Sequence, residues 1–70
     1  MRLTIIIEEG ENGWLVGQLE EIPAVIEQGK TVDELKNNLL RALDFYLETQ
    51  RLQTEQEYQG RGYTQELLVA

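Results

Sequence analysis

The sequence predicts an α+β fold in the order β-β-β-α-β, with an antiparallel sheet of three to four strands and one long helix packed on one face. Three observations predict it. Short β-branched segments occupy the first thirty residues, a helix-capping signal follows at residues 31–34, and apolar residues then recur at helical spacing. A chain of 70 residues has room for one hydrophobic core, so residues 1–70 are expected to form a single domain.

The first two strands are expected to form a hairpin. Residues 3–8 are rich in isoleucine, residues 14–19 are again apolar, and the segment between them contains Gly10 and Gly13. Because side chains alternate between the two faces of a strand, the loop length decides which residues share a face. A five-residue loop over residues 9–13 keeps one face apolar, with a glycine supplying the positive φ of the turn.

The remaining sheet and the helix follow from local signals. Pro23, the only proline, marks a corner, and residues 25–28 form a short third strand that ends at Gly29. Thr31 and Glu34 have the spacing of a capping box, in which the threonine hydroxyl accepts from the amide of Glu34 and the carboxylate returns to the amide of Thr31. A helix is expected from about residue 32 to residue 49, with an apolar stripe made of Val32, Leu35, Leu39, Ala42, Leu43 and Tyr46, and widened by Leu40 and Leu47.

Two segments complete the chain. Residues 51–62 are polar and are expected to form a loop or an extension of the helix, and the glycines at 60 and 62 break it. Residues 63–69 predict a final strand that places Tyr63, Leu67 and Val69 on one face.

The composition excludes several classes of function. Six Lys and Arg against thirteen Asp and Glu give a formal charge of −7, which disfavours direct binding of nucleic acid. The absence of His and Cys removes the usual zinc ligands and the usual catalytic bases and nucleophiles. The carboxylates stand mostly in adjacent pairs at turns and strand ends, where solvation is expected rather than the close, partly buried arrangement that catalysis needs. We therefore expect no enzymatic activity, no cofactor and no metal site.

The chain has no apolar run of the roughly 20 residues that a membrane span needs. Its first residues, Met-Arg-Leu-Thr, do not resemble the start of a signal peptide. The expected location is the cytoplasm.

One group of residues is a candidate interaction site. In the expected hairpin register, Ile6, Trp14 and Val16 lie on the face opposite the helix, and a single helix covers only one face. One interpretation is that Trp14 lies over neighbouring side chains at the sheet margin with its indole N–H in water. The other is that the three residues form an exposed apolar patch for self-association or for a partner.

Four segments together resemble the HicB-type antitoxins, in particular their short UPF0150-like members. These segments are Gly13-Trp14-Leu15-Val16, the corner Ile22-Pro23, the run Gln28-Gly29-Lys30-Thr31-Val32-Asp33-Glu34-Leu35, and the helical Leu43-Asp44-Phe45-Tyr46-Leu47. The resemblance covers about residues 3–48. The chain departs from the family pattern at its corner, which keeps one proline of "P-D-L-P-G", and it has no counterpart of the C-terminal DNA-binding module.

The resemblance implies a partial ribonuclease-H-like or double-stranded-RNA-binding-like fold. It also implies a role as the antitoxin that neutralises a basic HicA-type ribonuclease, an mRNA interferase. Because the DNA-binding module has no counterpart and the chain is acidic, no direct DNA binding is expected. Acidic charge suits such a partner, since complementary potentials steer association. A homodimer or higher homo-oligomer is expected for so small a domain. The alternative is an orphan, self-associating structural or regulatory domain that has no toxin partner.

Overall fold

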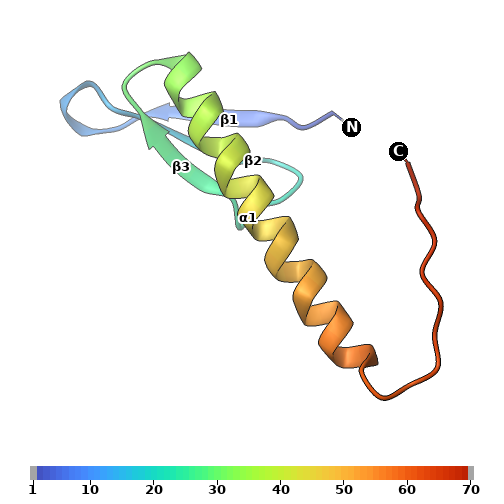
Figure 1. The fold of residues 1–70 in the computed structure, drawn as a ribbon. Helices are drawn as coiled ribbons and strands as arrows, with labels where there is room; N and C mark the ends of the chain where they lie inside the picture. Colours follow the sequence, from blue (N-terminus) through green and yellow to red (C-terminus); the bar gives the residue numbers. More distant parts are fainter. Residues whose placement is uncertain (1, 70) are drawn as a thin grey trace.

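The computed structural model describes residues 2–69 and has two layers, a three-stranded sheet and one long helix (Figure 1). The strands are all antiparallel and lie in the order β1-β2-β3. This architecture confirms the predicted α+β class with the helix packed on one face of the sheet. The elements are β1 (Ile5–Glu9), the 3₁₀ turn η1 (Glu11–Gly13), β2 (Leu15–Leu19), β3 (Ile26–Gly29) and α1 (Val32–Tyr58).

The β1–β2 hairpin has the predicted loop length but not the predicted loop position. The last pair is Glu9 with Leu15, so the five-residue loop covers residues 10–14 instead of 9–13. A hydrogen bond from the Gly10 amide to the Trp14 carbonyl (2.7 Å) closes this loop, and Asn12 and Gly13 adopt positive φ angles of 58° and 79° inside it. The register therefore differs by two residues from the prediction, and a shift of two leaves every side chain on its predicted face.

The core lies between the sheet and the first half of α1. Leu35 sits at its centre, directly above the two strand glycines Gly17 and Gly29. A Cβ atom at Gly17 would lie 2.8 Å from a Leu35 methyl carbon, and one at Gly29 would lie 2.7 Å from the Leu35 backbone nitrogen. The helix can approach the sheet this closely because neither strand position carries a side chain. The buried residues are Leu19, Val25, Leu35, Leu39 and Leu43.

The helix begins at the predicted cap. The Thr31 hydroxyl accepts a hydrogen bond from the Glu34 amide (3.0 Å), as the capping box predicts. The Glu34 carboxylate, however, accepts from the amide of Lys30 (3.2 Å) rather than from that of Thr31. It therefore satisfies a backbone donor one residue before the cap.

The C-terminal part of the chain differs from the prediction. α1 continues past the expected end near residue 49, so that residues 51–58 extend the helix rather than form the alternative loop, and it ends before Gly60, whose φ is +85°. The predicted strand over residues 63–69 is wrong for the described chain, because these residues form no ladder with any strand and are exposed. The 27-residue helix is about 40 Å long and ends far beyond strands of four or five residues. No helix within residues 2–69 is apolar enough along its length to cross a membrane.

A charged hydrogen bond ties the start of β1 to the corner after β2. The Glu21 carboxylate accepts from the Thr4 amide at 2.7 Å, beside a backbone bond from the Glu20 amide to the Thr4 carbonyl. The hydrogen bond from Thr4 favours the ionised carboxylate and holds the pKa of Glu21 below its ordinary value of 4.5. Folding stability linked to Glu21 is therefore complete above pH 4.5 and is lost as the pH falls through the lower, folded-state pKa.

We expect Glu21→Gln to be less stable than the wild type at pH 6, because the amide accepts the same hydrogen bond without a charge. Urea denaturation at pH 6 and at successively lower pH values measures the difference between the two proteins. The difference should shrink below pH 4.5, as the wild-type carboxyl becomes protonated. A difference that stays constant at every pH would contradict the role assigned to this carboxylate.

Candidate protein-binding surface

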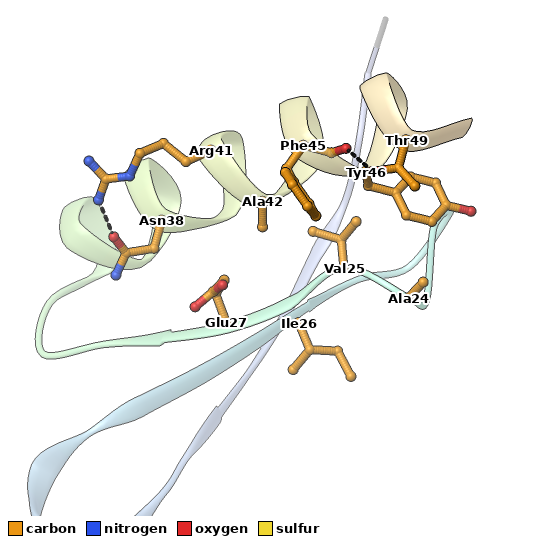
Figure 2. Close-up of a pocket in the computed structure, with 10 residues that line it drawn as sticks. All are labelled: Ala24, Val25, Ile26, Glu27, Asn38, Arg41, Ala42, Phe45, Tyr46 and Thr49. Atoms are coloured by element: carbon orange, nitrogen blue, oxygen red, sulfur yellow. Dashed lines mark hydrogen bonds between the residues drawn. The ribbon is translucent and has the colours of Figure 1, made fainter. Parts of the chain in front are cut away.

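The sheet face away from α1 carries three exposed apolar side chains, one from each strand. Ile6 and Ile26 both lie beside Gln18, which pairs with each of them, and Val16 occupies the next position on the same face of β2. Figure 2 shows Ile26 pointing away from α1, while the preceding Val25 points toward it. We call this surface, made by Ile6, Val16 and Ile26, the outer apolar patch.

Local packing explains why these residues face outward. Gly17 lies under Leu35 on the helix side, so its neighbours Val16 and Gln18 face the other way. In β1, Ile5 packs toward Gly17, and Ile6 therefore points outward. Val16 is the diagonal neighbour of both Ile6 and Ile26, at about 7–8 Å between Cα atoms, which is within reach of branched side chains, and Gln18 lies between Ile6 and Ile26 in the ladder.

The structure places the three predicted interface residues in different surroundings. Ile6 and Val16 are exposed on the outer face, as predicted from the alternation. Trp14 lies in the hairpin loop instead of the strand, is half-buried, and has the Lys30 ammonium 5.2 Å from its ring centroid. A cation placed over an indole ring in this way contributes about 0.5–1 kcal/mol at an exposed site. Trp14 is therefore a partly covered residue of the hairpin loop rather than a member of the exposed patch.

Ile26 is the member of the patch that sequence reasoning missed. The adjacent apolar pair Val25 and Ile26 shows that one of the two faces outward, but not which one. The structure settles this through the ladder, in which Ile26 pairs with the outward-facing Gln18. Val25 is 2% exposed and Ile26 is 52% exposed.

The surroundings of the patch are acidic. The sheet and its connections contain six carboxylates but only two bases, Arg2 and Lys30, and among the described residues no charged or polar side chain is buried. The acids gather at the hairpin end and at the opposite corner of the sheet, and one lies on β3. They are Glu8, Glu9, Glu11, Glu20, Glu21 and Glu27.

The acids do not converge in the way a catalytic or metal site would need. Glu8 and Glu9 are neighbours in β1, so their side chains point to opposite faces of the sheet. Within residues 2–69, no three His, Cys, Asp or Glu side chains are grouped closely enough to hold a metal ion. The arrangement supplies negative potential and an apolar contact area, which are the components of a protein-binding surface.

A concave surface, separate from the outer apolar patch, lies between β3 and α1 (Figure 2). It is a groove of about 540 Å³, with Val25, Ala42 and Tyr46 among its lining residues and the largely exposed Phe45 at its side. At one end, Asn38 donates to the Gln28 carbonyl (2.8 Å) and thereby occupies the edge of β3. Tyr46 packs against the core, as expected for a residue of the apolar stripe.

The fold and the surface define a class: a small, acidic, two-layer α+β domain with an exposed apolar patch on its sheet. Within that class, the chain belongs to the UPF0150 family. It is 32% identical over 56 residues to UPF0150 protein ssr1258 of Synechocystis sp., which covers 80% of this chain and 81% of that protein. It is also 32% identical over 60 residues to a UPF0150 protein of Archaeoglobus fulgidus, which covers 86% of this chain and 87% of the relative. No protein-family model matches the chain, and no solved structure is significantly similar to it.

Proposed function

We propose that this UPF0150 chain is an antitoxin-like protein-binding domain of the HicB type, which neutralises a small basic HicA-type mRNA interferase by occluding it. The observation that carries the proposal is the outer apolar patch, which α1 leaves uncovered and which lies on the more acidic part of the chain. The resemblance of residues 3–48 to the HicB pattern supports the choice of partner.

The chemistry of the patch suits a basic protein. The branched side chains of the patch supply apolar surface that is removed from water on binding. This burial stabilises a complex by about 25 cal/mol per Å² of apolar surface. The carboxylates at both ends of the sheet raise the rate of encounter with a basic partner and orient it. Occlusion needs no catalytic group, and the proposed role is accordingly non-enzymatic.

A second candidate is an orphan structural or regulatory domain that associates with itself and has no toxin. The same outer apolar patch favours it, because a second copy would also cover Ile6 and Ile26. The reading frames beside the gene separate the two candidates. A neighbour that encodes a small basic protein with a single histidine favours the antitoxin, and its absence favours the orphan domain.

The test is inhibition of RNA cleavage by the interferase that such a neighbour encodes. The wild-type chain should abolish cleavage at an equimolar ratio. Ile26→Lys should weaken inhibition at least tenfold, because it removes apolar contact area and places a positive charge against a basic partner.

The matched control is Leu52→Lys, which makes the same change at a position on α1 that is also 52% exposed but lies away from the sheet. It should inhibit like the wild type. Equal inhibition by the wild type and both variants would reject the outer apolar patch as the binding surface. Failure of the wild type to inhibit would reject the antitoxin role itself.

A further inference from the structure

We propose that residues 63–69, here called the C-terminal arm, pair as an added strand with the free edge of β1 in a second copy of the chain. Each copy would then give its arm to the other, which closes a two-fold symmetric dimer. The proposal concerns self-association and does not depend on whether a toxin exists.

The arm itself points to a missing strand partner. Its sequence alternates like a strand, with Tyr63, Leu67 and Val69 on one face, yet no part of it joins a ladder in the described chain. Residues 67–69 are between 92% and 97% exposed, and all three are apolar. Consecutive large apolar residues in such full contact with water mark a contact site rather than a finished surface.

The arm begins beside the outer part of α1 and, within residues 2–69, forms no strand with its own sheet. Tyr63 is held at the far end of α1 by an edge-on contact with Tyr58, at 5.7 Å between ring centroids. Thr49 is the last helix residue beside the groove at β3, and Tyr58 lies about 14 Å further along the axis. An extended chain uses about four residues to cover that distance. Of residues 63–69, only Leu68 and Val69 would then reach the level of the sheet.

The outer part of α1 has the character of a spacer. The helix face that carries Leu39 and Leu43 over the sheet continues beyond it as Gln50, Gln53 and Glu57. These polar side chains have no apolar surface to cover. The helix thus carries the start of the arm past the end of its own sheet without burying a side chain there, and the arm then turns back alongside α1 (Figure 1).

The β1 edge offers what the arm needs. Within residues 2–69, β1 pairs with β2 on one side only, so its other side presents free backbone groups to an added strand. On the helix side of the sheet, an open groove of about 260 Å³ runs past Leu3, Ile5, Leu40 and Leu43. Leu40 is largely exposed there, because α1 lies mainly over β2 and β3.

The alternation of the arm matches both faces of this edge. With Leu67 and Val69 turned toward α1, they enter the groove beside Leu40, while Leu68 falls on the outer face next to Ile6. The β3 edge fits less well. Asn38 already binds its Gln28 carbonyl, and Glu27 there would repel the carboxylate of Glu66.

Sedimentation velocity on the full-length chain tests the proposal. The wild type should sediment as a dimer at high micromolar concentration, and the double variant Leu67→Asp with Val69→Asp should be a monomer with an unchanged circular dichroism spectrum. The control Leu52→Asp makes the same change at an exposed apolar position outside the arm, and it should remain a dimer.

A mixing experiment identifies the acceptor. Leu40→Asp places a charge in the groove and should also be monomeric, but it keeps an intact arm. Mixed with the arm double variant, which keeps an intact groove, it should form a one-armed heterodimer that neither variant forms alone. A wild type that stays monomeric, an arm double variant that stays dimeric, or a mixture without heterodimer would overturn the proposal.

Discussion

Leu35→Ala is expected to lower the free energy of unfolding by about 2–5 kcal/mol. Leu35 is fully buried and fills the space between α1 and the two strand glycines, so its removal leaves a cavity that the backbone cannot close. Because small domains are stable by only about 5–15 kcal/mol, this single change removes a large share of the total. Urea denaturation followed by helical circular dichroism measures it.

The matched control is Leu52→Ala, a leucine half-exposed on the same helix but beyond the sheet. Its loss should stay within about 0.5 kcal/mol, as is usual for surface positions. Similar losses of unfolding free energy for the two variants would contradict the packing of α1 on the sheet through Leu35.

Gly29→Ala is expected to cost about 1–3 kcal/mol, near the upper end of that range. The new Cβ would lie 2.7 Å from the nitrogen and 2.9 Å from the Cα of Leu35, both backbone atoms, so the start of the helix must move. At Gly17 the closest atoms are methyl carbons of the Leu35 side chain, which can rotate away. We therefore expect a smaller loss for Gly17→Ala, measured by the same denaturation.

Gly62→Ala serves as the control for both glycine variants. A Cβ there meets no atom within 4 Å, and Gly62 lacks the positive φ that favours glycine. Its stability should match that of the wild type or rise slightly, because alanine restricts the unfolded chain. Equal stability of all three alanine variants would contradict the close approach of α1 to the sheet.

Local signals in the sequence predicted the elements near the core well. The Thr31 cap, the buried stripe through Leu35, Leu39 and Leu43, and the five-residue hairpin loop all follow from short-range chemistry. The loop position was wrong because Asn12 and Gly13 both adopt positive φ, which moves the turn one residue toward the C-terminus. Local composition does not show which of several candidate residues takes that conformation.

Features that depend on distant neighbours were harder to predict. Residues 51–58 lack an apolar face, so periodicity could not distinguish an extended helix from a loop. Residues 63–69 have a strand pattern, but a strand forms only beside another strand, and in the described chain these residues pair with none.

The candidate surface was predicted only in part, because the position of some of its residues depends on how the strands pair. The odd loop length placed Ile6 and Val16 on the outer face even though the register was shifted by two residues. Trp14 was assigned to the strand, whereas it ends the loop and is covered by Lys30. Ile26 could be assigned to the outer face only once its pairing with Gln18 was known.

The most direct test of the proposed function is to map where the partner binds. Backbone amide shifts of the labelled chain would be recorded by nuclear magnetic resonance during titration with the HicA-type interferase. Binding through the outer apolar patch predicts that the largest shifts fall at Ile6, Val16 and Ile26. Shifts centred instead on Asn38, Phe45 and the groove beside β3 would contradict this account of the binding surface.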